Sequence, residues 1–353
     1  MKFEVYSDKE ILEEILLESS KYQNWNNILK HHSDVYLNMS QTDYDLEIAL
    51  ADESILFQYL QDTGGKEPIP NEQFFIDFEA DNNIVEGKPL SAFFLKKGDA
   101  EINSLKEHFG LLFQNEKIDD KIISNKFQKN CNKNDIYNNA GLIGWKAIMP
   151  TQTLGYNSLI ITDPHLFNND KNVNGVFVNY GVENIILFLD AILPLQLGVE
   201  FHLLIVSSRQ NGGFSEAKMQ SIFHDLNTRI IALRGYSITT ELVITPNSIH
   251  RRSSFSNYHL INCDKGFKLF SIDDPSRVND DNSFKYWNIF EINLQAHGDS
   301  QFKELVDEVP KIKAGIRSAI NTINGMKRNL EDKKCYGLPP DYSIKNRLIN
   351  HFP

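Results

Sequence analysis

Three apolar segments separated by helical patterns are the feature that most constrains how this chain folds. They read NSLIITD (157–163), EFHLLIVSS (200–208) and SITTELVIT (237–245). The stretches between them, VENIILFLDAIL and SEAKMQSIFHDLNTRIIALRGY, have the periodicity of helices. Strands that alternate with helices form a parallel sheet covered on both faces. We therefore predict an α/β fold with a mixed, largely parallel sheet and helices on both faces. YHLINC and GFKLFSI should add an antiparallel pair.

The composition changes near residue 150. Residues 1–150 contain 15 lysines, no arginine and 26 acidic residues, which accounts for the net charge of −11 of the whole 353-residue chain. We predict an acidic α+β region over 1–150 and, over 151–353, the α/β domain with a long C-terminal helix. An acidic surface repels nucleic acid, so a polyanionic partner is expected to contact the arginine-bearing second part.

Cysteines and apolar segments indicate the compartment. Cys131, Cys263 and Cys335 are odd in number and far apart, which fits neither a zinc site nor a disulfide framework. No apolar stretch follows a basic start, and no run of the sequence reaches the roughly 18 apolar residues of a membrane span. We therefore expect a cytoplasmic protein with reduced cysteines, no membrane contact, no bound metal and no cofactor.

One short motif carries the chemistry. The stretch PNSIHRRSSFSNYHLINCDKGFKLF follows the third apolar segment and places His250, Arg252 and Asn257 at the spacing His-x-Arg-x4-Asn. Together with the order of elements before it, this stretch resembles one half of a phospholipase D-like domain, over about residues 157–300. The signature of that superfamily is His-x-Lys-x4-Asp, placed after a central strand. The resemblance therefore implies a phospholipase D-like fold with these three residues in its active site.

The resemblance also implies a metal-independent reaction at a phosphodiester. In that family one histidine attacks phosphorus, a second protonates the leaving oxygen, and lysines stabilise the transition state. Here His250 would attack and Arg252 would hold the phosphate as a bidentate donor. Asn257 would position a ring, but it cannot stabilise an imidazolium. Loss of the equivalent carboxylate from a serine-protease triad costs about 10⁴ in rate.

Polar residues at the strand ends extend this candidate site. Ser207 and Ser208 end the second apolar segment and lead toward a helix N-terminus, which is either a natural anion site or an ordinary βα loop. The phosphate-binding candidates are therefore Arg251, Arg252, Ser207 and Ser208. Asp163 ends the first segment before Pro164. It either faces the ligand crevice or only forms the turn.

Two further groups of carboxylates stay open to interpretation. Asp163 or Glu241 could support the ring of His250 in place of the missing carboxylate of the motif. In the first region, NEQFFIDFEAD is predicted to be a strand, on which Asp77, Glu79 and Asp81 would point the same way. Such a row either binds a divalent metal or forms the exposed face of an edge strand.

Two functions compete at this point. The departures from the family signature favour a non-catalytic or weakly active phospholipase D-like subunit. It would bind nucleic acid, phosphate or a protein partner through the C-terminal part, in a bacterial defence or mobile-element assembly. The alternative is a metal-independent phosphodiesterase or nuclease that acts through a phosphohistidine at His250. The family uses two motifs and this chain has one, so the alternative would require a homodimer. A histidine and two arginines on a solvated strand end would explain the motif without any site.

Overall fold

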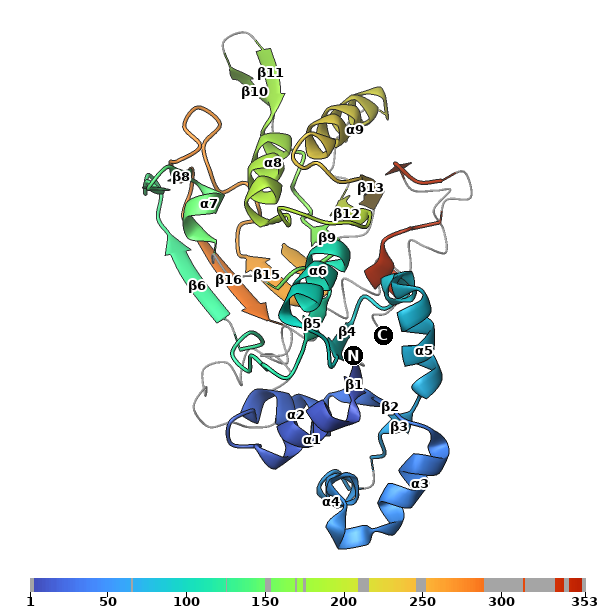
Figure 1. The fold of residues 1–353 in the computed structure, drawn as a ribbon. Coiled ribbons are helices and arrows are strands. Elements are labelled where there is room, and N and C mark those ends of the chain that lie inside the picture. The colour runs from blue at the N-terminus through green and yellow to red at the C-terminus, as the bar shows by residue number, and fades with distance from the viewer. Residues whose placement is uncertain are drawn as a thin grey trace. The chain divides into compact units, whose positions relative to one another are not determined.

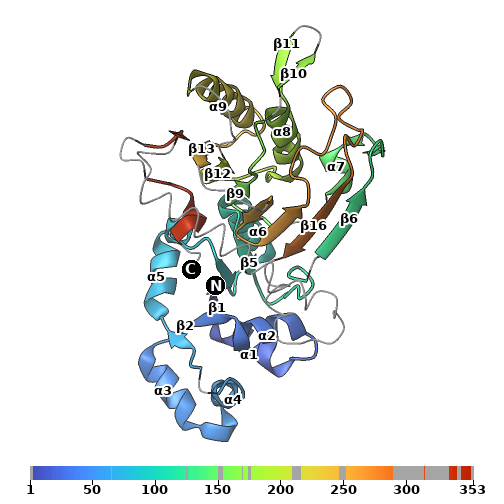
Figure 2. The same cartoon turned by 180° about the vertical axis from the view of Figure 1, so that it is seen from behind.

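The structure is a computed structural model. It describes residues 3–64, 66–124, 126–149, 154–168, 170–173, 176–208, 216–245, 252–288, 314, 334–339 and 343–350. The chain forms two compact units, drawn from opposite sides in Figures 1 and 2. The first contains the described residues as far as Ser124, with Leu154–Tyr156 and Asn288. The boundary thus lies near residue 125, and not near 150 as the composition indicated.

The first unit is built on a five-stranded parallel sheet with the strand order β3-β2-β1-β4-β5. Its strands are β1 (Phe3–Asp8), β2 (Ser33–Asn38), β3 (Ile69–Pro70), β4 (Ser91–Phe94) and β5 (Leu112–Gln114). Its helices are α1 (Lys9–Leu17), α2 (Gln23–His31), α3 (Gln41–Ala49), η1 (Ala51–Glu53), α4 (Ile55–Asp62), α5 (Glu72–Ala80), η2 (Asn82–Gly87) and α6 (Asp99–Phe109). The expectation of an α+β region is therefore wrong, because these strands are parallel and alternate with helices.

The predicted strand NEQFFIDFEAD is helix α5. Asn71 caps it, since its side chain accepts a hydrogen bond from the Phe74 backbone N at 3.2 Å. Phe74, Phe75 and Phe78 are buried and lie on one face of the helix. Residues two apart do not share a face of a helix, so the expected row of carboxylates does not form.

The second unit contains an eight-stranded mixed sheet with the order β17-β13-β12-β9-β14-β15-β16-β6. Its strands are β6 (Lys126–Cys131), β9 (Ser158–Thr162), β12 (Phe201–Ser208), β13 (Ile238–Thr245), β14 (Ser253–Ser256), β15 (His259–Cys263), β16 (Asn282–Asn288) and β17 (Lys334–Tyr336). Two short hairpins are β7 (Asn138–Asn139) with β8 (Leu142–Ile143), and β10 (Asp170–Val173) with β11 (Val176–Asn179). The helices are α7 (Trp145–Ile148), α8 (Tyr180–Ile192), α9 (Glu216–Ile231) and η5 (Arg347–Asn350).

The predicted alternation of strands and helices is present in this sheet. The sheet is mixed but not largely parallel as predicted, because β17, β14, β15 and β6 join it through antiparallel pairs. β9, β12 and β13 are parallel and are joined through α8 and α9. The two crossovers step along the sheet in the same direction, so right-handed connections place α8 and α9 on one face, and not on both faces as predicted. α8 contacts both α7 and α9, as this arrangement requires. The long C-terminal helix expected after residue 300 lies outside the described residues.

The antiparallel part of the sheet differs from the expected hairpin. YHLINC forms β15, but its antiparallel partner is β14 and the register is Ser254 with Ile261. GFKLFSI forms no strand in the described structure beyond a single bridge from Phe270 to Val278. The other side of the antiparallel part is closed by β6 on β16. These strands lie side by side in both views, green beside orange, although they are far apart in sequence (Figures 1 and 2).

Candidate functional site

The residues of the motif lie at the two ends of one short strand. His250 and Arg251 are outside the described residues. Arg252 immediately precedes β14, and Asn257 immediately follows it. β14 runs antiparallel to β9, with Ser253 opposite Thr162 and Ser256 opposite Leu159. Arg252 is therefore at the carboxyl end of β9 and Asn257 at its amino end. At about 3.3 Å per residue, roughly 16 Å separates the two, so the structure does not bring them together.

The side chain of Asn257 is buried and makes hydrogen bonds within the fold. It is 0% exposed, and its Oδ1 accepts hydrogen bonds from the backbone N of Asn157 at 3.1 Å and of Ser158 at 3.0 Å. Its Nδ2 donates to Asn157 Oδ1 at 3.1 Å. These bonds join the turn between β14 and β15 to the start of β9. An amide suits this position because it both donates and accepts, which a carboxylate cannot do.

Asp163 is the buried carboxylate at the carboxyl end of β9. It is 0% exposed, and its two oxygens accept from the backbone N of His165 at 2.9 Å and of Phe267 at 3.1 Å. It thus forms the turn after β9 and also holds the distant segment at Phe267. Burial raises the pKa of Asp163, while the two amides and the nearby Lys268 and Arg252 oppose that rise.

Two cations flank this carboxylate. Lys268 Nζ donates to His165 O at 2.8 Å, and Arg252 Nη1 donates to Asp264 O. The Nε of Arg252 is buried and has no hydrogen-bond partner among the described residues. Burial lowers the pKa of Lys268, and so does the charge of Arg252, while Asp163 opposes both. With Asp163 ionised, two positive charges face one negative charge, so the local charge is positive.

His165 completes the group, which we call the carboxyl-end cluster (Asp163, His165, Arg252 and Lys268). Burial lowers the pKa of His165, and the charge of Arg252 lowers it further. The Asn168 Nδ2 lies 3.2 Å from His165 Nδ1, so Nδ1 accepts and the ring proton is on Nε2. The cluster therefore presents a neutral imidazole beside two cations.

Local structure fixes the cluster in place. Gly266 has φ +88°, and a Cβ there would collide with Asp163 Oδ2 and lie 2.9 Å from Arg252 Cδ. Only glycine, which has no Cβ, allows the backbone to lie this close to the side chains of Asp163 and Arg252. On either side of Lys268, Phe267 and Phe270 are both 0% exposed. Tyr180 of α8 donates its hydroxyl to Phe270 O at 2.7 Å, which anchors the segment that carries Lys268.

Ser207 and Ser208, at the end of β12, differ in their contacts with the carboxyl-end cluster. Ser207 is 2% exposed and donates its hydroxyl to the Asp163 backbone O at 2.8 Å, so it supports the turn. Ser208 is the last residue of β12 and is half-buried. Sequence reasoning placed these serines and Arg252 at one edge of the sheet, which the structure shows. It missed Lys268, because only the turn at Gly266 brings that residue to the cluster.

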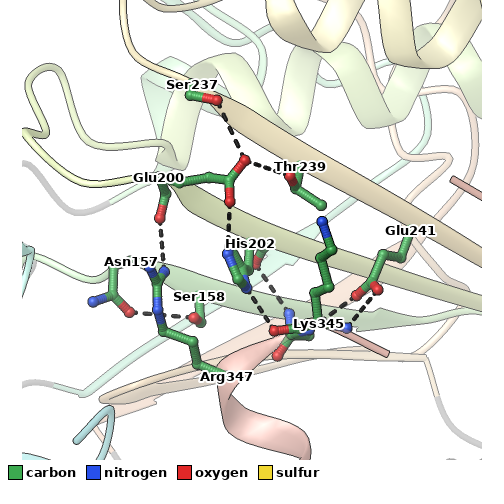
Figure 3. Close-up of polar contacts among 10 residues, drawn as sticks. Asn157, Ser158, Glu200, His202, Ser237, Thr239, Glu241, Lys345 and Arg347 are labelled. Atoms are coloured by element: carbon green, nitrogen blue, oxygen red, sulfur yellow. Dashed lines mark hydrogen bonds and ion pairs between the residues drawn. The ribbon is translucent and has the colours of Figure 1, made fainter. Parts of the chain in front are cut away.

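Glu241 lies in a different network, shown in Figure 3. Glu241 is on β13, two strands from the strand β9 that Asp163 follows. It lies three residues closer to the amino ends of these parallel strands than Asp163 does. It is 0% exposed and accepts from the backbone N of Lys345 at 2.6 Å and of Asn346 at 3.0 Å. Burial raises the pKa of Glu241 to about 7. The carboxylate thus binds the segment Ser343–Asn350, which we call the docking segment.

Neighbouring residues hold the docking segment as well. The ring of His202 has Nδ1 2.6 Å from Lys345 O and Nε2 3.1 Å from Glu200 Oε2 (Figure 3). Arg347 Nη1 donates to Glu200 O at 2.7 Å. Burial lowers the pKa of His202, and the charge of Arg347 lowers it further. We call the surface formed by Leu159, Glu200, His202 and Glu241 the docking groove.

In the described part of the chain, no group of three or more His, Cys, Asp or Glu side chains is arranged to hold a metal ion. No helix there is long and apolar enough to cross a membrane. Comparison of the sequence with protein-family models, and with curated proteins, finds no match.

Proposed function

We propose that the second unit binds a backbone phosphate of a nucleic acid at the carboxyl-end cluster. The observation that carries this proposal is the pair of cations, Arg252 and Lys268, beside the single carboxylate Asp163. A phosphate would balance the excess positive charge and would accept from the Nε of Arg252, which has no partner among the described residues. Ligands of open α/β sheets bind outside the carboxyl ends of the strands, which is where this cluster lies.

The phospholipase D-like resemblance agrees with this assignment. The order β9, α8, β12, α9 and β13 follows the order of elements expected from the resemblance, although the hairpin after β13 is formed by β14 and β15 and not by YHLINC and GFKLFSI. Arg252, at the position of the family's lysine, is one of the two cations of the cluster. Asn257, at the position of the family's aspartate, is committed to the fold at the far end of β14. This use of Asn257 supports a subunit that binds phosphate without turning it over.

The test is a binding measurement in EDTA with labelled single- and double-stranded DNA and RNA, by fluorescence anisotropy. The double variant Arg252→Gln/Lys268→Gln should lose at least about tenfold in affinity and lower the salt dependence. Lys265→Gln is the matched control. It removes one charge from the same loop, where Lys265 Nζ pairs with Asp280 at 3.3 Å. Its affinity should change by less than about twofold.

Two results would contradict the proposal. One is a wild-type protein that binds none of the four nucleic acids at low salt. The other is an equal loss of affinity in the double variant and in Lys265→Gln, which would mean that only the overall charge matters. Asn257→Ala should keep the affinity of the wild type, because its side chain faces the other end of the sheet.

The neutral imidazole of His165 favours one further candidate, metal-independent cleavage of the bound strand. A neutral ring is the form that can attack phosphorus or transfer a proton. The same samples decide this by gel electrophoresis. Cleavage that persists in EDTA and disappears in both His250→Ala and His165→Ala would establish the phosphodiesterase. Intact strands with wild-type protein, at a concentration where binding is complete, would exclude it.

A further inference from the structure

β6 is an outer strand of the eight-stranded sheet. In the described structure it pairs with β16 alone, and it is the outermost strand on that side of the sheet in both views (Figures 1 and 2). The side chains of Gln128 and Asn130 on this strand are exposed. An outer strand presents a row of backbone N–H and C=O groups to which a further strand can bond. The edge of β6 is therefore open to another chain.

The register of β16 identifies the backbone groups that face outward from β6. Asp264 N donates to Ser283 O at 3.0 Å, so Ser283 directs its backbone groups toward β15. The direction alternates along a strand, so the next residue, Phe284, bonds to the residue of β6 that lies between Gln128 and Asn130. By the same alternation, Gln128 and Asn130 direct their N–H and C=O groups outward. These outward groups have no hydrogen-bond partner among the described residues.

The charge along this edge is positive. β6 and β16 together contain three lysines, Lys126, Lys129 and Lys285, and no acidic residue. Lys126 and Lys285 lie on one face of the sheet and Lys129 lies on the other. Like charges on neighbouring strands are destabilising, so these lysines oppose pairing of β6 with a second copy of itself. They favour a strand that carries acidic side chains.

We propose that the free edge of β6 is an interaction surface for an acidic protein segment, which binds by adding a further strand to the sheet. The outward backbone groups of β6 would supply the hydrogen bonds, and the lysines would select the charge of the segment. This surface is separate from the phosphate site, because β6 is four strands from β9 in the sheet. At about 4.8 Å per strand, that separation is roughly 19 Å.

The first test measures binding of a fluorescein-labelled peptide, EVEVEVE, to the full chain by fluorescence anisotropy at low salt. Wild-type protein should bind it and should not bind KVKVKVK. Gln128→Pro removes one outward N–H, and proline is tolerated on an outer strand where the N–H faces solvent. Gln128→Thr keeps the N–H and is the matched control. The affinity should fall at least about fivefold in the first variant and less than about twofold in the second.

A modified peptide gives a test that needs no variant of the protein. EVEVEVE with every backbone amide N-methylated keeps its charge but cannot donate hydrogen bonds from its backbone. Its affinity for wild-type protein should be at least about tenfold lower than that of the unmodified peptide. Equal affinities would show that charge alone attracts the peptide and would overturn the proposal. No binding of the unmodified peptide would overturn it as well.

Two controls separate this surface from other occupants and from the phosphate site. A wild-type dimer that Gln128→Pro converts to monomer, in analytical ultracentrifugation without peptide, would make a second copy the occupant and overturn the acidic segment. Arg252→Gln/Lys268→Gln should bind EVEVEVE as tightly as the wild type does. A tenfold loss in that double variant would place the peptide at the carboxyl-end cluster and would overturn the proposed edge, whatever the result for nucleic acid.

Discussion

The carboxyl-end cluster and the docking groove belong to one sheet and contain the same kinds of residue, but they use them differently. In the docking groove, Glu241 and Asn346 have hydrogen-bond partners from the chain itself for their buried polar atoms. In the carboxyl-end cluster, positive charge exceeds negative charge and the Nε of Arg252 has no partner in the described residues. The comparison teaches that a group of buried charged residues does not by itself mark a ligand site. What distinguishes a ligand site is the bonding that the fold leaves unsatisfied.

The largest expected effect is on the docking groove, from the variant Asn346→Asp. A carboxylate there cannot donate to Leu159 O and His202 O, and it places a negative charge against both carbonyls. The free energy of unfolding should fall by about 3 kcal/mol or more, because a buried charge is left unpaired. Urea denaturation measures it, with the exposed Lys345→Ala as control at about 0.5 kcal/mol or less. A loss under about 1 kcal/mol would remove the contrast between the two regions.

An intermediate effect is expected from pH at Glu241. Its pKa is about 7 in the folded protein, above the ordinary value of 4.5, so the folded state binds the proton more tightly. The stabilisation is complete below pH 4.5 and is lost as pH rises through about 7, by about 3 kcal/mol in total. The measurement is urea denaturation from pH 4.5 to 8 for wild type and Glu241→Gln. The difference between the two curves removes the other groups, such as His202, whose lowered pKa gives the opposite slope. If the free energies of unfolding of the wild type and Glu241→Gln changed in parallel with pH, the raised pKa of Glu241 would be contradicted.

The smallest effect on stability is expected at Arg252. Its guanidinium is partly exposed and makes one hydrogen bond to Asp264 O in the described structure. Arg252→Gln should lower the free energy of unfolding by about 1 kcal/mol, since it removes one hydrogen bond of a partly exposed side chain. The same urea series measures it beside Asn346→Asp. A loss similar to that of Asn346→Asp would make Arg252 a structural residue and would weaken the proposed phosphate site.

The parallel part of the second unit could be predicted from the sequence. β9, β12 and β13 each contain a run of consecutive buried apolar residues, at 159–161, 203–206 and 242–244, so these strands need no alternation of apolar and polar residues. The helix α5 could not be separated from a strand. Its buried Phe74, Phe75 and Phe78 have helical spacing, while the acidic residues at 77, 79 and 81 alternate as on a strand. Local patterns of this length are ambiguous, and tertiary packing decides between them.

The candidate site was predicted in part. The motif drew attention to Arg252, which lies at the carboxyl end of β9, and Asp163 was singled out by its place after a buried strand. The sequence spacing between Arg252 and Asn257 did not predict where Asn257 lies. The four-residue strand β14 separates the two residues, so they lie at its opposite ends. The contribution of Lys268 depends on a left-handed turn at Gly266, and that of Asn346 on a contact across most of the second unit. Neither leaves a local pattern in the sequence.

The hydrogen bonds that Asn346 Nδ2 donates to β9 and β12 also have a consequence for how the protein is synthesised. Its partner Leu159 precedes it by 187 residues. A ribosome that adds about 5–20 residues per second needs roughly 10–40 s to cover that distance. During this interval β9, β12 and β13 can assemble, but the Glu241 carboxylate has no amide to bind. The emerging chain therefore carries an unfinished sheet until the segment with Asn346 has been synthesised.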